Sequence, residues 1–298
     1  MSNIVTIAEA MNGMVRIRAA RTTEMVEEAR KAHDCWPTSA AALGRTMSAA
    51  AIMGTDLKNE NETITVVING HGPAGTVLVQ AKGNGDVRGF VANPQVYLSR
   101  EDGHLDVGKA VGTDGTLTVT KNLGLKEPFT GVVDLQSGEI GQDFAYYFAI
   151  SEQTPTIVSV GVLVAEDYSI KASGGMIIQL MPGADEACIE ACEKIAAEMK
   201  PMSDLVLEGN SAEDIIRMYF PDAEIIGERE IRWHCGCSRE GFFAALKTLA
   251  EKDLQEMIDD DKGAEITCQY CSKQYSFTTA DLKRVLEEKN VEDRLRCN

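Results

Sequence analysis

Four cysteines near the C-terminus are the residues whose type and spacing can support chemistry. Cys235 and Cys237 form a C-x-C pair in HCGCSRE, and Cys268 and Cys271 form a C-x-x-C pair in CQYCSK. Thiolates serve as metal ligands and as redox groups, and each pair puts two sulfurs on a tight turn. Two such turns that face each other make a tetrahedral sulfur cage, which suits one Zn²⁺ ion. The spacing therefore predicts a zinc site at these four residues.

The pattern alone leaves other kinds of site open. A purely structural zinc site is the simplest interpretation, and a redox site or an iron–sulfur cluster are the alternatives. The C-x-C pair is unusual, because structural zinc ribbons commonly use C-x-x-C twice. Once a metal leaves, the two thiols of the C-x-C pair are close enough in sequence to form a disulfide easily, although the small ring that this disulfide closes is strained. His234 is a further candidate ligand. Four sulfurs already complete the coordination of a zinc ion, so we expect His234 to contact the ligand residues and not the metal itself.

The charge of such a site needs an offset. Four thiolates on one divalent ion leave a formal charge of about −2. Arg232, Arg239 and Lys273 are near the cysteines in sequence and are candidates for that offset, as are backbone N–H groups directed at sulfur.

The elements around the cysteines form a small unit over residues 231–298. The pattern predicts a helix over 239–260, a hairpin over 264–278 that carries the C-x-x-C pair, and a last helix over 279–290. A unit of this size has little core, so its fold must depend on what the cysteines bind.

The first 184 residues predict a mixed α/β core. Strand patterns separated by glycine turns occupy residues 3–10, 14–20, 62–70, 75–82, 86–92, 115–122, 129–135, 156–166 and 170–182. Helical patterns occupy residues 22–35, 37–57 and 139–153, and the small residues of the second helix indicate close packing against a sheet. Strands in runs with helices grouped elsewhere favour an α+β fold with a mostly antiparallel sheet.

Residues 185–230 have a different composition and predict a helical linker. They carry 13 acidic and 4 basic side chains, which is more than half of the net charge of −17. Helical spacing puts a narrow apolar stripe on one face, made of Ala184, Ala187, Cys188, Ala191, Cys192, Ile195 and Met199. Prolines then divide the rest into short helices. A helical segment with so little apolar surface is marginal alone, so we expect it to dock on its neighbours.

Four further cysteines lie outside the paired motifs. Cys188 and Cys192 belong to the apolar stripe and are expected to be buried as small hydrophobic residues, with an accessory redox role left open by their spacing. Cys35 is expected in the core or in a loop. Cys297 is expected to be exposed and open to adventitious oxidation.

Composition also limits the compartment and the partners. A chain with a charge of −17 is a poor general binder of nucleic acid or anionic lipid, since phosphate contacts need clustered basic residues. The first 20 residues lack the basic region of a secretory signal, and the longest apolar stretch, 157–165, is too short to span a bilayer. We therefore expect a cytoplasmic protein with reduced thiols and without nucleic-acid or membrane partners.

HCGCSRE followed by CQYCSK resembles the redox switch of the heat-shock protein 33 family, the redox-regulated holdase chaperones. The likeness extends over the whole chain. GDVRGFVANP (85–94), FTGVVDLQSGEIGQDFAYYFAISEQTPT (129–156) and SGGMIIQLMPGA (173–184) resemble family blocks in the same order. The four further cysteines are a departure, because the family switch uses the paired motifs alone.

The resemblance implies a chaperone core over 1–184, a metastable helical linker over 185–230 and a C-terminal zinc redox-switch domain over 231–298. It implies a reduced, inactive form with one zinc ion on Cys235, Cys237, Cys268 and Cys271. Oxidants then expel zinc and form the disulfides Cys235–Cys237 and Cys268–Cys271. The linker unfolds, and the chain holds unfolding client proteins without ATP. A monomer–dimer shift is also implied, with a homodimer when oxidised.

Two other functions compete with this one. A thiol oxidoreductase would use the C-x-x-C pair catalytically, but that pair is not in a βαβ setting, and the C-x-C pair favours a cage. A zinc-ribbon module that binds nucleic acid is opposed by the net charges of −9 over 185–230 and −2 over 231–298. The sequence therefore favours a chaperone without enzymatic activity.

Overall fold

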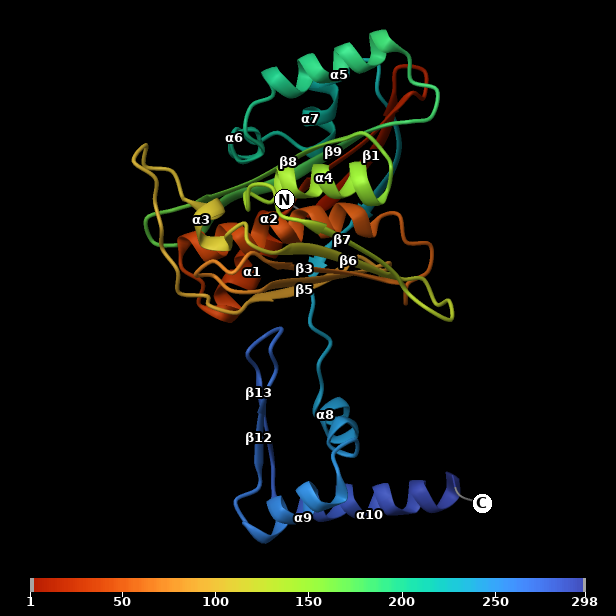
Figure 1. The fold of residues 1–298 in the computed structure, drawn as a ribbon. Helices are drawn as coiled ribbons and strands as arrows, with labels where there is room; N and C mark the ends of the chain where they lie inside the picture. Colours follow the sequence, from red (N-terminus) through yellow and green to blue (C-terminus); the bar gives the residue numbers. More distant parts are fainter. Residues whose placement is uncertain (1–2, 297–298) are drawn as a thin grey trace. The chain divides into compact units, whose positions relative to one another are not determined.

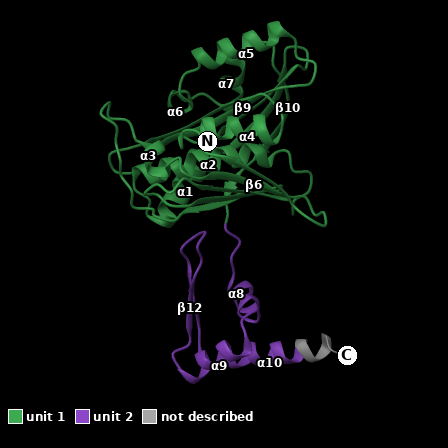
Figure 2. Cartoon of the chain, viewed as in Figure 1, with its two compact units in different colours: residues 1–234 green, residues 235–298 purple. Residues whose placement is uncertain are grey.

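The chain divides into two compact units, Met1–His234 and Cys235–Asn298, in a computed structural model that describes residues 3–296 (Figure 2). The predicted α+β class is confirmed, although unit 1 contains two sheets where the sequence predicted one. Within the described residues, no helix combines the length and the apolar character needed to cross a membrane.

The first sheet of unit 1 has five antiparallel strands in the order β10-β1-β2-β9-β8. Its strands are β1 (Ile4–Ala10), β2 (Val15–Arg21), β8 (Thr156–Val164), β9 (Ile170–Leu180) and β10 (Glu224–Glu230). Alternate residues of β1, β2 and β9 face opposite sides of the sheet, and both sides are buried against other elements.

The second sheet has six strands in the order β11-β5-β4-β3-β6-β7, antiparallel except where β11 pairs with β5. Its strands are β3 (Thr63–Asn69), β4 (Val77–Lys82), β5 (Asp86–Val91), β6 (Thr116–Asn122), β7 (Phe129–Asp134) and β11 (Arg232–Trp233). The short helix α3 (Val107–Val111) precedes β6, and the sequence pattern did not predict it.

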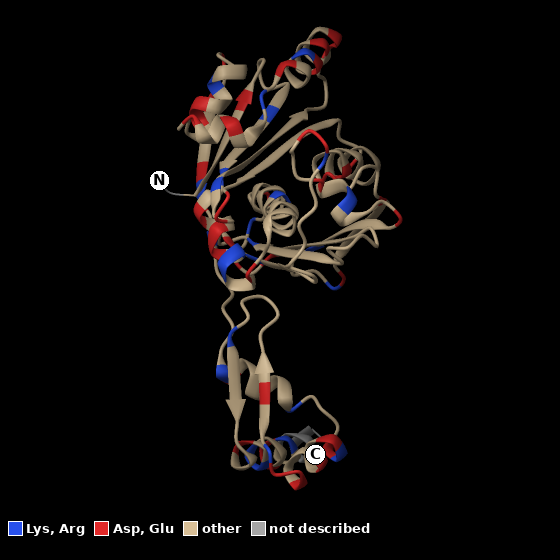
Figure 3. Ribbon diagram, turned by 90° about the vertical axis from the view of Figure 1, so that its left-hand side faces the viewer, with Lys and Arg blue, Asp and Glu red and all other residues tan. Residues whose placement is uncertain are grey.

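Helix α2 (Pro37–Gly54) lies between the two sheets and packs against both (Figures 1 and 3). Every residue of α2 is buried except Arg45. Its small residues make this possible: a Cβ on Gly44 would lie 2.6 Å from Val26 and 2.9 Å from Val162. The predicted close packing is confirmed, and α1 (Thr23–His33) and α4 (Gly141–Ser151) complete this core.

Three helices from residues 185–230 pack on the other face of the five-stranded sheet. Helices α5 (Glu186–Glu198), α6 (Met202–Leu207) and α7 (Ala212–Tyr219) cover Ile17, Met176 and Ile178 of that face (Figure 1). Acidic residues are frequent in these outer helices, and their positions are red on the ribbon in Figure 3. The last residues of the segment form strand β10, which pairs with β1, whereas the sequence predicted helices throughout.

Unit 2 has its own small core. Its elements are α8 (Arg239–Leu246), α9 (Glu251–Asp259), β12 (Ala264–Thr267), β13 (Gln274–Phe277) and α10 (Thr279–Arg296). The single helix predicted over 239–260 is therefore wrong, because α8 ends at Leu246. The hydroxyl of Thr248 donates to the carbonyl of Ala245 at 2.7 Å, which closes the last turn of α8.

Candidate metal centre

The C-x-x-C pair lies in the turn of the hairpin β12–β13. The strands stay in register up to the pair Thr267 and Gln274. Beyond that pair, the Cys268 N–H donates to the carbonyl of Lys273 at 2.9 Å, and the Ser272 N–H donates to the carbonyl of Cys268 at 2.8 Å. Ser272 has a φ of 57°, which turns the chain back toward β13. These bonds fix Cys268 and Cys271 on one compact turn.

The C-x-C pair lies in the segment just before α8. Gly236, between the two cysteines, has a φ of 64°, a conformation that glycine adopts without strain. The Ser238 side chain accepts the Gly241 N–H at 3.0 Å and caps α8. The cap fixes where α8 begins, and it therefore fixes the position of Cys237 directly before it.

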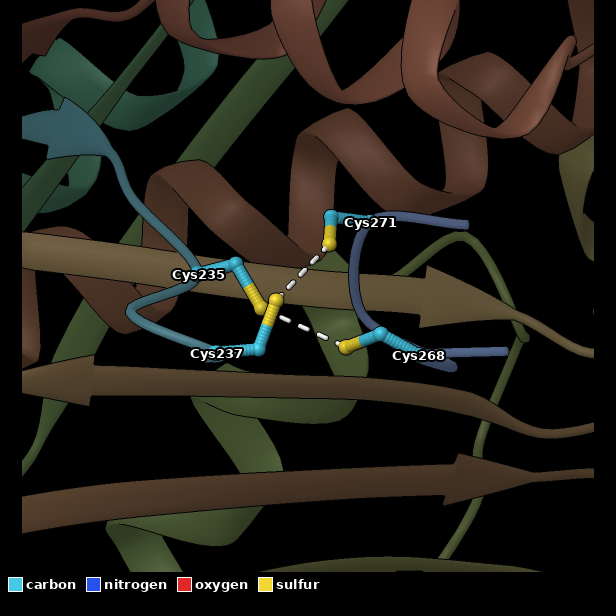
Figure 4. A group of neighbouring side chains, drawn as sticks. All are labelled: Cys235, Cys237, Cys268 and Cys271. Carbon is cyan, nitrogen blue, oxygen red and sulfur yellow. Dashed lines mark hydrogen bonds between the residues drawn. The ribbon is translucent and has the colours of Figure 1, made fainter. Parts of the chain in front are cut away.

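The two turns bring all four sulfurs together (Figure 4). The Cys235 and Cys268 sulfurs are 3.5 Å apart, and the Cys237 and Cys271 sulfurs are 3.4 Å apart. All four sulfurs lie within 4.8 Å of one another. A tetrahedral zinc site with metal–sulfur bonds of ~2.3 Å has sulfur–sulfur edges of about 3.8 Å. The donor set and its spacing therefore fit one zinc ion.

The cage has a buried side and an accessible side. Cys235 and Cys268 are 8% and 4% exposed, whereas Cys237 and Cys271 are half-buried. Burial raises the pKa of Cys235, although the backbone N–H of Cys237 opposes that shift. Burial also raises the pKa of Cys271, and the backbone N–H of Lys273 opposes it. These two N–H groups are directed at sulfur, as the sequence suggested for the charge offset.

Tyr275 is a contact of the site that the sequence analysis missed. Its hydroxyl donates to the carbonyl of Cys237 at 3.1 Å, and its oxygen lies 3.2 Å from the Cys237 sulfur. Burial alone would raise the pKa of Cys237, but the neighbouring Tyr275 hydroxyl and the other thiols lower it to about 7. The strand pattern of β13 indicates that Tyr275 and Phe277 share its inward face, but it does not identify Cys237 as the partner of Tyr275.

The basic side chains proposed to offset the charge have other partners. Arg232 is paired with Asp86 at 2.7 Å within unit 1. Arg239 is paired with Asp281 at 2.8 Å and lies over the Phe277 ring. Lys273 lies over the ring of Tyr275, 5.3 Å from its centroid. Arg232 and Arg239 are therefore committed to carboxylates, whereas Lys273 lies beside Tyr275, a contact of Cys237.

The remaining candidates lie outside the four-sulfur group. Within the described residues, that group consists of the four paired cysteines, and His234 is not a member. Cys35 is buried in the core of unit 1, as predicted. Cys188 and Cys192 are buried on α5, also as predicted. Cys297 lies outside the described residues.

Three comparisons place the chain among known proteins. A family model described as Hsp33 protein matches residues 4–278. The 33 kDa chaperonin of Clostridium botulinum (strain Alaska E43 / Type E3) is 47% identical over 290 residues, covering 96% of this chain and 98% of its own length. That of Staphylococcus carnosus (strain TM300) is 47% identical over 293 residues, covering 95% and 97%.

The fold agrees with a solved relative as well. The crystal structure of the 33 kDa chaperonin (heat shock protein 33 homolog) from Thermotoga maritima matches with a TM-score of 0.88 and 35% sequence identity, covering 97% of this chain and 99% of that one. The resemblance inferred from the cysteine motifs is thus confirmed over nearly the whole length, and the chain belongs to the Hsp33 family.

Proposed function

We propose that this chain is an ATP-independent holdase chaperone of the cytoplasm, switched on by oxidation of its four paired cysteines. Membership of the Hsp33 family and the similarity to proteins named chaperonins support the chaperone activity. The observation that carries the switch is the group of four sulfurs within 4.8 Å of one another. Thiols gathered so closely either share a metal ion or oxidise in pairs.

In the reduced state, Cys235, Cys237, Cys268 and Cys271 would hold one zinc ion. The ion would supply the charge that keeps all four sulfurs as thiolates and ties the two turns together. Structural zinc sites have apparent binding free energies of about 10–16 kcal/mol at neutral pH. Among the residues that the structure describes, the buried core of unit 2 comprises seven side chains: Leu246, Leu254, Ile258, Tyr275, Phe277, Leu282 and Val285. A core this small supplies only a few kcal/mol, so the fold of unit 2 depends on the cysteines.

Oxidation then removes the ligands. Peroxide reaches the half-buried sulfurs of Cys237 and Cys271 first. A thiolate attacks a peroxide oxygen and becomes a sulfenic acid with loss of hydroxide, and the partner thiol displaces water to form the disulfide. We expect the pairs Cys235–Cys237 and Cys268–Cys271. When the four sulfurs no longer share a metal ion, the two turns can move apart. The two cysteines of each motif stay close, because only one or two residues separate them in the sequence.

The linker would transmit this change to the core. We assign residues 1–184 to the chaperone core, 185–230 to the linker and 231–298 to the switch domain. The linker covers the apolar outer face of the five-stranded sheet, and four residues separate the end of β10 from Cys235. When the switch domain unfolds, the linker loses its ordered C-terminal neighbour and melts. The uncovered apolar face would then bind unfolded clients.

One experiment tests this function. Zinc and free thiols are counted in the purified chain before and after peroxide, while light scattering follows aggregation of a heat-denatured client protein. We expect one zinc per reduced chain, loss of four thiols together with zinc, and suppressed aggregation only after oxidation. Disulfide mapping by mass spectrometry distinguishes the expected pairs from Cys235–Cys268 and Cys237–Cys271. Suppression of aggregation that is equal in reduced and oxidised samples would rule out the switch.

A further inference from the structure

Helix α5 contributes two cysteines to the core on the outer side of the five-stranded sheet. Cys188 and Cys192 are the buried side chains of this helix, 3% and 1% exposed. Ile195 and Met199 add partial burial, whereas Ala187 of the predicted stripe is exposed. By contrast, α6 and α7 bury three residues each, among them Leu205 and Ile215. Figure 1 shows α5 at the outer edge of this layer, next to α7.

The two thiols lie in a sulfur-rich contact. The Cys188 sulfur lies 3.5 Å from the Met11 sulfur, in the turn between β1 and β2. Each of the two thiols shifts the pKa of the other, as expected for neighbours one turn apart on the same face of a helix. The docked helix therefore holds two thiols side by side, and its attachment depends on their remaining small and apolar.

An intact helix nevertheless keeps these thiols from joining. Side chains four residues apart on a helix have Cβ atoms about 5–6 Å apart. A disulfide requires a Cβ–Cβ distance of about 3.5–4.5 Å. The bond and the helical turn between residues 188 and 192 therefore exclude each other. Once the turn unwinds, the three intervening residues let the two sulfurs meet.

We propose that Cys188 and Cys192 are a second redox site, which forms a disulfide only after α5 has left the sheet and unwound. The proposal rests on the proposed function in one respect, namely that the linker opens during activation. The disulfide would then act as a latch, because α5 cannot re-form its helix or return to the sheet until the bond is reduced.

The docked state protects both thiols. Burial, with a smaller effect of the neighbouring Cys188 thiol, raises the pKa of Cys192 from 9.0 to about 11. Burial also raises the pKa of Cys188, and the neighbouring Cys192 thiol opposes this shift. The thiolate is the form that reacts with peroxide, so this rise in pKa lowers the reactive fraction of the docked thiol. Opening of α5 removes both the steric and the electrostatic protection.

The chemistry needs one oxidant and no cofactor. The thiolate of one cysteine attacks hydrogen peroxide, which gives a sulfenic acid and hydroxide. The second thiol attacks the sulfenic sulfur, a disulfide forms and water leaves. Two thiols thus lose two electrons and two protons, and one peroxide becomes two waters.

Peptide mapping of the full-length, zinc-loaded chain tests the site. Ile195→Pro breaks α5 without touching either thiol, and the buried Cys35 is the internal control. After brief exposure to peroxide, we expect the Cys188–Cys192 disulfide to form at least about tenfold faster in Ile195→Pro than in the wild type, as thiolate exposure dictates. Cys35 should stay reduced in both. Equal rates in the two chains, or no such disulfide in the open variant, would overturn the proposal.

The latch is tested by the return to the resting state. Wild type, Cys188→Ala and the matched Cys35→Ala are oxidised, then given reductant and zinc, and the loss of holdase activity is timed. Cys188→Ala should lose activity several-fold faster than the other two, since it has no bond to reduce in α5. If all three chains lose holdase activity at the same rate, the disulfide does not act as a latch, and the proposed redox switch is unaffected. If no chain gains holdase activity on oxidation, the proposed function is wrong. Peptide mapping then still shows whether the Cys188–Cys192 disulfide forms.

Discussion

The hydroxyl oxygen of Tyr275 lies 3.2 Å from the sulfur of Cys237, and the same hydroxyl donates to the Cys237 carbonyl at 3.1 Å. One side chain from β13 therefore holds both the backbone and the sulfur of the C-x-C turn. The ring of Phe242 packs on Tyr275 with its centroid 5.1 Å away, which fixes the phenol from the α8 side. Tyr275 thus links the two cysteine motifs independently of any metal.

Removal of this hydroxyl should weaken the zinc site without removing a ligand. Partners that orient metal ligands contribute 10–100-fold to metal affinity. We expect Tyr275→Phe to lower zinc affinity about 10-fold, measured by competition with a chromophoric chelator. Tyr97→Phe, on the surface of unit 1, is the matched control and should match the wild type. Equal affinities for all three chains would show that the phenol acts only in packing.

Removal of the metal should unfold unit 2 and spare unit 1. The small core of unit 2 cannot replace roughly 10–16 kcal/mol of apparent metal-binding free energy. After chelation under reducing conditions, hydrogen exchange should reveal lost protection in α8, α9 and the β12–β13 hairpin. The amides of α2 should stay protected. A chelated, reduced sample that keeps its C-terminal amides protected would contradict this dependence.

Loss of one ligand should partly mimic oxidation. Cys268→Ser replaces a buried thiolate by a hydroxyl, a poor zinc ligand, and leaves three sulfurs. We expect weaker zinc binding and higher holdase activity without oxidant, measured as aggregation of a denatured client in reducing buffer. Cys35→Ala, which alters a buried thiol far from the motifs in sequence, should keep its zinc and stay inactive. A Cys268→Ser chain that loses zinc but stays inactive would separate metal loss from activation.

The sequence was sufficient to predict the four-sulfur group, because short spacings limit where each pair of thiols can lie. It was also sufficient for the buried α2, whose alanines and glycines suit a helix between two sheets. It did not predict β10, since the residues EIIGERE alternate weakly and carry four charges. They form a strand because β1 offers its edge, and such tertiary pairing overrides local preference.

Two other differences have local causes. The helix predicted over 239–260 ends at Leu246, because the Thr248 hydroxyl bonds to the preceding turn and α9 restarts at Glu251. The contact between Tyr275 and Cys237 joins residues 38 positions apart, so no spacing argument could find it. Long-range side-chain contacts of this kind depend on how the hairpin meets the segment before α8.

We expect release of the linker, rather than oxidation itself, to create the client-binding surface. Gly161 of β8 offers a direct way to release it. A Cβ at this position would lie 2.7 Å from the backbone nitrogen of Ser203, so α6 has to move away from the sheet. Overpacking of this kind costs about 1–3 kcal/mol. Gly227 of β10 lies in the same sheet and has nothing within 4 Å of its Cβ position, so Gly227→Ala is the matched control.

The decisive measurement is light scattering of a denaturing client with zinc-loaded chains under strictly reducing conditions, while hydrogen exchange follows the linker. Gly161→Ala should lose protection over α5 to α7, keep its zinc and suppress aggregation without any oxidant. Gly227→Ala and the wild type should stay protected and inactive. If Gly161→Ala has an unprotected linker and is still as inactive as the wild type, linker release does not create the client-binding surface.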